Sequence, residues 1–223
     1  MRAWMVTDIE IERDVKAELQ WDPRVDATDI AVSVRDGVVT LAGFVREYGD
    51  KYAAETATKR VAGVVAVAND IEVRLPTKDQ RPDPAIARDA VAAIKSRLPS
   101  SWEGIKVVVR DGYINLEGEV EWQYQSETAE AAVRWVPGVR GVSNLIRIRP
   151  RAAPPHEVKR RIEDALKRHA EIEARHIVVE TNGSEVILKG VVRSWAERDQ
   201  AVRVAWSAPG VTKVDDRIVV EPL

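Results

Sequence analysis

Histidine is the side chain best suited to proton transfer or metal binding near neutral pH, and the chain has three: His156, His169 and His176. His156 and His169 share one expected helix but are not an i, i+4 pair, whereas a zinc site favours such pairs or a tight cluster with carboxylates. No cysteine is present, which excludes disulfides and thiolate chemistry. The segment "GVRG" at 138–141 is too short for a phosphate loop, and no recurring carboxylate pair suggests a shifted pKa. We therefore expect surface histidines, no metal, no cofactor and no enzymatic activity.

Aromatic residues are the more informative group, because seven tryptophans accompany a single phenylalanine. The candidate lipid- or partner-binding residues are Trp122, Tyr124, Arg134, Trp135, Arg140 and Trp206. Trp206 lies about 160° from the apolar stripe of its expected helix, so we expect it to face outward. Three interpretations stay open: packing between neighbouring parts of the chain, contact with anionic phospholipid by tryptophan and arginine, and contact with a protein partner, including self-association.

These residues lie within a threefold internal repeat, which is the strongest signal in the sequence. In each copy an opening isoleucine, a first glycine, a second glycine and a closing isoleucine recur at the same three intervals. The opening isoleucines are Ile30, Ile105 and Ile177; the glycines are Gly43, Gly118 and Gly190, then Gly63, Gly138 and Gly210; the closing isoleucines are Ile71, Ile146 and Ile218.

The periodicity of each copy predicts helix, strand, strand, helix, strand. Apolar residues spaced by four mark a first helix, as in Ile11, Val15 and Leu19. Two alternating strands follow, joined by Asp36-Gly37 in the first copy and by a turn shifted to Asn182-Gly183 in the third. A second helix with a stripe of small residues then runs to just before the second glycine. Asp83 is expected as the N-cap of the middle copy's first helix.

The six glycines are interpreted as structural. The first glycine of each copy permits a bend or a close approach of backbones, and the second is expected directly after the second helix, where positive φ is favoured. At position +5 after the first glycine, Tyr48 and Trp195 are expected to pack at the entrance of their own helices. The sequence thus predicts an α/β (α+β) fold of three tandem αββαβ units, each with two helices on a three-stranded mixed sheet. The predicted boundaries are 1–77, 82–150 and 154–223.

Bulk properties narrow the function classes. A sequence pI near 6.0 and a formal charge of −2 argue against a general nucleic-acid binder. Only the segment 80–151 is net positive, with 11 Lys and Arg against 9 Asp and Glu. No apolar run reaches the roughly 20 residues of a transmembrane helix. The start of the chain has no secretory signal, so we expect a cytoplasmic protein, or a periplasmic one if the true start lies upstream.

The repeat resembles the BON domain, a family named for bacterial osmotic-shock and nodulation proteins. The likeness rests on "VDATDIAVSVRDGVVTLAG" at 25–43, on the small-residue helix and on the "GVxxV" pattern after each second glycine. The resemblance implies the αββαβ order and a bacterial, stress- or envelope-related role in binding phospholipid rather than catalysis. Some relatives act as chaperones and at least one binds potassium. The functions considered are therefore phospholipid binding, a chaperone-like or structural protein interaction, and small-cation binding.

Overall fold

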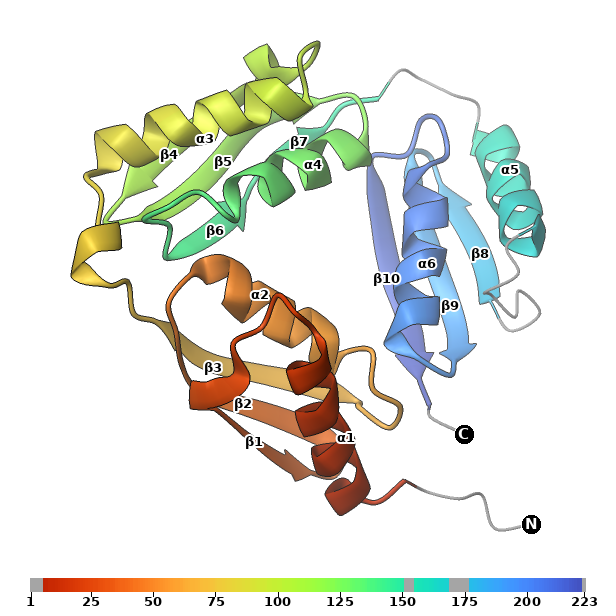
Figure 1. Ribbon diagram of the computed structural model, residues 1–223. Helices are drawn as coiled ribbons and strands as arrows, with labels where there is room; N and C mark the ends of the chain where they lie inside the picture. Colours follow the sequence, from red (N-terminus) through yellow and green to blue (C-terminus); the bar gives the residue numbers. More distant parts are fainter. Residues whose placement is uncertain (1–5, 151–154, 169–176, 222–223) are drawn as a thin grey trace.

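The computed structural model describes residues 6–150, 155–168 and 177–221, which form three units of the same design (Figure 1). Unit 1 comprises α1 (Asp8–Trp21), β1 (Ile30–Arg35), β2 (Val38–Val45), α2 (Tyr48–Thr58) and β3 (Ala66–Val73). Unit 2 comprises α3 (Asp83–Arg97), β4 (Ile105–Arg110), β5 (Tyr113–Val120), α4 (Gln123–Val133), β6 (Gly141–Asn144) and β7 (Arg147–Ile148). Unit 3 comprises α5 (Pro155–Arg168), β8 (Ile177–Asn182), β9 (Glu185–Val192), α6 (Trp195–Trp206) and β10 (Lys213–Val220). Short 3₁₀ helices are η1 (Ala27–Asp29), η2 (Thr77–Asp79) and η3 (Trp102–Gly104). The predicted α+β fold of three tandem units is confirmed.

Each unit has a mixed sheet with its second strand in the middle. β2 pairs antiparallel with β1 and parallel with β3, and β9 does the same with β8 and β10. In unit 2 the closing strand is divided into β6 and β7, which both pair parallel with β5. The opening isoleucine faces the first glycine in every unit, as in the pair Ile30 and Gly43. The repeated interval from isoleucine to glycine is therefore the register of a hairpin.

The first glycine of units 1 and 2 is required by a close approach of two backbones. Gly43 has φ +126°, and a Cβ atom there would lie 1.9 Å from the carbonyl oxygen of Asp29. Gly118 has φ +120°, and its Cβ would lie 2.0 Å from the carbonyl oxygen of Gly104. Both the positive φ and the missing space exclude a side chain.

The second glycines also have positive φ, but they do not directly follow a helix as predicted. Their φ values are +88° at Gly63, +94° at Gly138 and +87° at Gly210. In unit 1 the helix already ends at Thr58. Beyond that point the amides of Arg60 and Val61 bond to carbonyls three positions back, so the chain continues in tighter turns. These turns keep the apolar spacing of the preceding helix, so the sequence pattern predicted a helix about one turn longer than the observed one.

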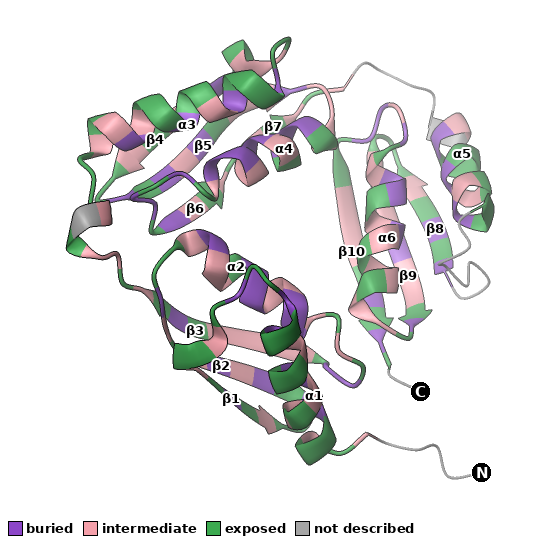
Figure 2. Ribbon diagram, in the orientation of Figure 1, coloured by how far each residue is buried: buried purple, intermediate pink, exposed green. Residues whose placement is uncertain are grey.

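Three hydrophobic cores are present, one within each unit. The predicted first-helix stripe is buried in all of them; Ile11, Val15 and Leu19 are at most 2% exposed. In Figure 2 the buried residues lie where the two helices of a unit face its sheet. Each unit thus folds around its own helix–sheet interface, and the contacts between units come from other residues.

Aspartates of the first helices bind the hairpin turns of units 1 and 2. The Asp8 carboxylate accepts hydrogen bonds from both turn amides, Asp36 N and Gly37 N, at 2.9 Å. Asp83 accepts from the two equivalent amides of unit 2, at 2.9 and 3.0 Å. The prediction of Asp83 as an N-cap was wrong, because α3 begins at Asp83 itself and Pro82 occupies the N-cap. Its carboxylate serves the neighbouring turn instead of its own helix.

The hairpin turn of unit 3 changes in type and not in position. The prediction of a turn shifted to Asn182-Gly183 was wrong, since Asn182 pairs with Glu185 and leaves Gly183 and Ser184 as the two loop residues. Gly183 has φ +61°, and glycine at the first loop position is typical of a type II′ turn. The helix residue equivalent to Asp8 is Pro155 in unit 3, so this turn has lost the carboxylate that binds the other two.

The three units are arranged with their second helices, α2, α4 and α6, towards the middle of the molecule (Figure 1). The contacts between units consequently involve the ends of these helices. The aromatic residues singled out in the sequence lie at or beside the same helix ends.

Candidate functional site

Units 1 and 2 are joined where the end of α4 meets the start of α2; we call this contact the 1–2 seam. The guanidinium of Arg134 lies 3.2 Å from the ring centroid of Tyr52 and forms an ion pair with Glu130 at 2.9 Å. The side chain of Arg134 is only 12% exposed. The indole of Trp135 lies against Gly49, where a Cβ atom would be 2.1 Å from the ring. This seam is closely packed, and its cation is already held between a ring and a carboxylate.

Tyr48 strengthens the same seam by leaving its own unit. Its ring packs against the hydrophobic core of unit 2. Burial raises the pKa of the Tyr48 hydroxyl, and the main chain of Val142 in unit 2 acts in the opposite direction. The expectation that Tyr48 packs at its own helix entrance is therefore corrected to a contact between units.

Units 3 and 1, which are not neighbours in sequence, also meet; we call this contact the 3–1 seam. Trp195 at the start of α6 donates a hydrogen bond from Nε1 to the carbonyl oxygen of Val64, at 3.0 Å. The ammonium of Lys59 lies 5.7 Å from the centroid of the same indole. Burial raises the pKa of Asp199, and the Lys59 charge is the first of the effects that oppose it. Trp195 thus connects the first and last units, a role that its expected local packing did not suggest.

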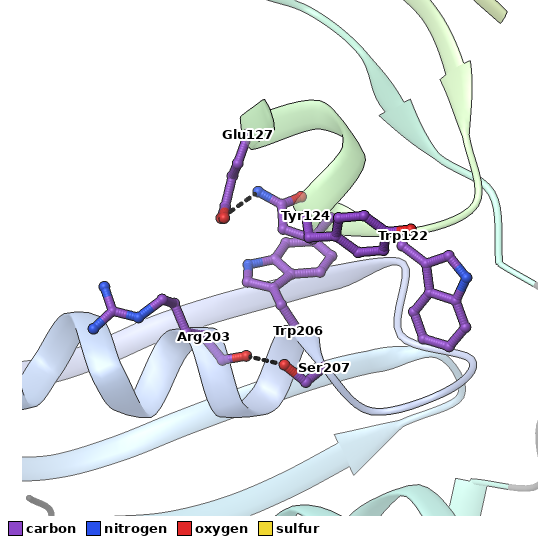
Figure 3. Close-up of a pocket in the computed structure, with 7 residues that line it drawn as sticks. Trp122, Tyr124, Glu127, Arg203, Trp206 and Ser207 are labelled. Atoms are coloured by element: carbon purple, nitrogen blue, oxygen red, sulfur yellow. Dashed lines mark hydrogen bonds between the residues drawn. The ribbon is translucent and has the colours of Figure 1, made fainter. Parts of the chain in front are cut away.

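Units 2 and 3 meet along an open cleft of about 250 Å³, which we call the 2–3 cleft. It is lined by Trp122, Gln123, Tyr124, Glu127, Arg203, Trp206 and Ser207. Figure 3 shows these side chains gathered from the start of α4 and the end of α6. Tyr124 keeps 59% of its surface exposed. Three of the seven lining residues are aromatic, and the others include one carboxylate and one guanidinium.

The three contacts follow one rule when residues are numbered from the first glycine of each unit. Positions +4 to +9, at the start of a second helix, face positions +16 and +17 at the end of the second helix of another unit. The end of the second helix of unit 2 contacts unit 1, that of unit 3 contacts unit 2, and that of unit 1 contacts unit 3. Head-to-tail contacts of this kind generate a ring when the rotation closes. The chain is therefore a closed, pseudo-threefold ring of its own repeats.

The structure divides the six candidate binding residues among three places. Trp122, Tyr124 and Trp206 share the 2–3 cleft. Arg134 and Trp135 belong to the 1–2 seam, although 43% of Trp135 stays exposed. Arg140 lies apart beside the unit 2 hairpin turn and lines a cavity of about 260 Å³.

Sequence reasoning missed several residues of these contacts. Arg81 lines the cavity beside Arg140 and also a smaller one of about 130 Å³ beside Trp135. Lys59 is another such residue, and it has the position in unit 1, +16, that Trp206 has in unit 3. The signal that could have found it is the shared position +16, read together with the aromatic residues at +5.

Two carboxylates, Asp50 and Asp22, have strongly shifted pKa values. Burial, together with the nearby charges of Glu47 and Asp26, raises the pKa of Asp50 to about 6. Asp22 is 4% exposed, and hydrogen bonds from Arg24 and Arg60 hold its pKa well below the usual range. Asp22 has a structural role because it ties the end of α1 to the segment after α2.

In the part of the chain that the structure describes, no group of three or more His, Asp or Glu side chains is arranged to hold a metal ion. His169 and His176 lie outside the described residues, as does the side chain of His156. Among the described helices, none combines the length and apolar character needed to cross a membrane.

The chain matches the BON domain three times, over residues 7–74, 86–150 and 156–222. It is 34% identical over 143 residues to osmotically-inducible protein Y of Escherichia coli (strain K12), covering 61% of this chain and 70% of that protein. Among solved structures it is similar to CdsD, a structural protein of the type III secretion system of Chlamydia trachomatis, at 15% identity and a TM-score of 0.28, covering 95% and 92% of the two chains. The C-terminal domain of CdsD gives 14% identity and a TM-score of 0.27, covering 97% and 100%.

Proposed function

Because this chain belongs to the BON domain family, we propose that it is a non-enzymatic binding protein that acts under osmotic stress and contacts anionic phospholipid surfaces through unit 2. The stress role is supported by the similarity to osmotically-inducible protein Y. The cytoplasmic location expected from the sequence is part of the proposal, since the cytoplasmic leaflet carries anionic lipid.

The lipid contact is assigned to one surface beside the 1–2 seam, the basic-aromatic patch, formed by Trp135, Arg81 and Arg140. Arg81 lines both the cavity next to Trp135 and the cavity next to Arg140, so the three side chains share one side of unit 2. Trp135 is 43% exposed, and Arg81 and Arg140 are exposed. A tryptophan at headgroup level next to arginines is a typical membrane-surface contact. This juxtaposition is the observation that carries the proposal.

The charges around the patch leave Arg140 available to a phosphate. Among the described residues, no acidic group forms an ion pair with Arg140, while Arg81 pairs with Asp89 at 3.3 Å. The carboxylate of Asp83, which lines the same cavity, is occupied by the hairpin amides. By contrast, Arg134 is already held inside the 1–2 seam, so it is excluded from the lipid contact.

Co-sedimentation of the full chain with vesicles tests the proposal. The protein should pellet with vesicles that contain anionic phospholipid and stay in solution with neutral ones. Each basic residue near an anionic surface contributes about 1 kcal/mol, so Arg140→Glu should weaken binding by at least roughly fivefold. Arg97→Glu reverses a charge at the other end of α3 and should change binding much less. Equal pelleting with both kinds of vesicle, or equal effects of the two variants, would contradict the proposal.

A protein partner, including a chaperone-like role, is the second candidate. It is favoured by the open face of the unit 3 sheet, where Val178, Val191 and Val219 are 43% to 55% exposed. Val191 and Val219 lie side by side in register, so they form a small apolar surface of the kind that marks protein contacts. An aggregation assay with a denaturing client, with wild type and Val219→Ser, separates this candidate from lipid binding. Suppression by wild type and loss of suppression in Val219→Ser would support it.

A further inference from the structure

The three contacts between units differ in one property: whether the residue at position +16 places a cation on an aromatic ring. In the 1–2 seam, position +16 is Arg134, which lies on the ring of Tyr52 and is paired with Glu130. In the 3–1 seam, position +16 is Lys59, whose ammonium lies over the ring of Trp195. Two of the three contacts thus place a cation from position +16 on an aromatic ring.

The 2–3 cleft has the rings and the carboxylate of such a contact without the cation. Its position +16 is Trp206, which adds a third ring to those of Trp122 and Tyr124. Glu127 lies at the edge of the same cleft and accepts a hydrogen bond from Gln123. Within the described residues, no lysine or arginine lies over the three rings of the cleft. The rings of the cleft therefore lack the cation that position +16 supplies to the rings of the other two contacts.

We propose that the 2–3 cleft binds a quaternary ammonium group from outside the protein. Aromatic side chains recognise such ions because the negative faces of the rings attract a cation that has no N–H to keep hydrated. The carboxylate of Glu127 adds charge complementarity. Trp206 is the residue that converts an internal seam into a ligand site.

Arg203 narrows the ligand to a zwitterion. It lines the cleft beside Trp206, is exposed, and is held by two hydrogen bonds to Gln200 Oε1, at 3.1 and 2.6 Å. A guanidinium in this place suits a carboxylate or phosphate joined to the ammonium group. Two sources have this chemistry: a free betaine, with a carboxylate, and the phosphocholine headgroup of a lipid, with a phosphate.

The inference is independent of the anionic-lipid proposal, because the cleft and the basic-aromatic patch share no residue. Isothermal titration of the full chain with tetramethylammonium, glycine betaine and phosphocholine measures binding. The neutral isostere 3,3-dimethylbutan-1-ol is the control for purely apolar binding. We expect the quaternary ions to bind, and the neutral alcohol to bind at least roughly tenfold more weakly. Tighter binding of betaine or of phosphocholine identifies the source, and phosphatidylcholine vesicles extend the test to a membrane.

Two variants and a matched control locate the site. Trp206→Lys replaces a ring with the cation that unit 1 has at this position, and it should lower the affinity by roughly tenfold or more. Glu127→Gln keeps the shape of the cleft and should weaken binding by at least roughly threefold. Tyr113→Ala removes an equally exposed tyrosine outside the cleft and should change nothing. Circular dichroism checks the fold of each variant.

Three outcomes would overturn the inference: no heat from any quaternary ion, equal affinity for the neutral alcohol, or unchanged binding in both cleft variants. Pelleting with anionic vesicles should be the same in Glu127→Gln and in wild type. If the cleft does not bind quaternary ammonium ions, the anionic-lipid proposal is therefore unaffected. If the protein does not bind anionic vesicles, the inference about the cleft is likewise unaffected.

Discussion

Gly49→Ala should open the 1–2 seam while making its own helix more stable. Gly49 lies in the first turn of α2, and a Cβ atom there would be 2.1 to 2.5 Å from three atoms of the Trp135 ring. No real contact is that short, so either the indole or the helix must move. Alanine is otherwise compatible with this helix position, because the equivalent residue of unit 3 is Ala196, which also lies in the first turn of its helix.

The size of the effect follows from the area that Trp135 covers. A fully buried aromatic side chain covers about 150–250 Å², and Trp135 keeps 43% of its surface exposed. Roughly 100 Å² is therefore covered by units 1 and 2 together, which at about 25 cal/mol per Å² corresponds to about 2.5 kcal/mol. The contact with unit 1 accounts for part of this, so about 2 kcal/mol is its upper value. Replacing glycine by alanine in a helix contributes about 0.5–1 kcal/mol in the opposite direction, to unit 1 alone. The seam should weaken by at most about 2 kcal/mol, or roughly 30-fold in the docking equilibrium.

Because the chain has no cysteine, donor and acceptor dyes can be attached through one introduced cysteine in each unit. Glu72→Cys in unit 1 and Arg97→Cys in unit 2 are both on exposed positions. Energy transfer between the dyes should be lost at a lower urea concentration in Gly49→Ala than in the parent chain. Ala196→Gly, the reverse exchange in unit 3, should leave this transition unchanged.

The double variant with Trp135→Ala completes the test. If the indole is the obstacle, Gly49→Ala should hardly change the urea transition of the energy transfer in a chain that already carries Trp135→Ala. An unchanged urea transition in Gly49→Ala, with a clear shift in Trp135→Ala, would refute the close contact. Equal shifts in the presence and absence of the indole would show that the helix start itself was disturbed.

Three further changes have defined expectations. Gly43→Ala should destabilise unit 1 by on the order of 3 kcal/mol, because φ +126° is strained for alanine and the Asp29 carbonyl oxygen occupies the Cβ position; normal hydrogen-exchange protection of the β1–β2 amides would contradict this. With a folded-state pKa of about 6, Asp50 binds more protons in the folded than in the unfolded state between pH 4 and 6, so its contribution to stability is lost as the pH rises through this range. Asp50→Asn should abolish this pH dependence of the free energy of unfolding, which amounts to about 1 kcal/mol after discounting for solvent. Urea titrations at pH 4.5 and 7 that give the same pH dependence in both proteins would count against it. Trp195→Phe removes the hydrogen bond to Val64 and should weaken the 3–1 seam by about 1 kcal/mol, seen as faster exchange of the Val65 and Val64 amides; protection equal to wild type would argue that the seam does not depend on it.

The repeat and the fold could be predicted because they depend on local rules. The interval from Ile30 to Gly43 fixes a hairpin register, and the apolar spacing of Ile11, Val15 and Leu19 fixes a helix face. Such patterns hold within one unit, where the chain has few alternatives. The errors were also local: periodicity cannot distinguish the last α-helical turn from the tighter turns that lead to Gly63.

The contacts between units could not be predicted in the same way, because no periodicity records which helix end meets which. Tyr48 and Trp195 share position +5, and we expected both at the entrance of their own helices. Packing between neighbouring parts of the chain was one of the open interpretations for the aromatic residues, but no pattern indicated which residues would meet. The structure shows that this position faces the neighbouring unit. Nothing in the spacing of Arg134 revealed that Tyr52, from another unit, would hold its charge.

Tandem duplication offers a physical account of why the 2–3 cleft differs from the other contacts. Three copies of one unit begin with the same head-to-tail surface, and the ring needs that surface only to hold the units together. The 1–2 and 3–1 seams do this with Arg134 and Lys59, and two such contacts are enough to close a ring of three units that the chain also joins. The third contact, which has Trp206 at this position, is therefore available for another role. A chain whose repeats close on themselves can thus keep two contacts for stability and use the remaining one to bind a ligand.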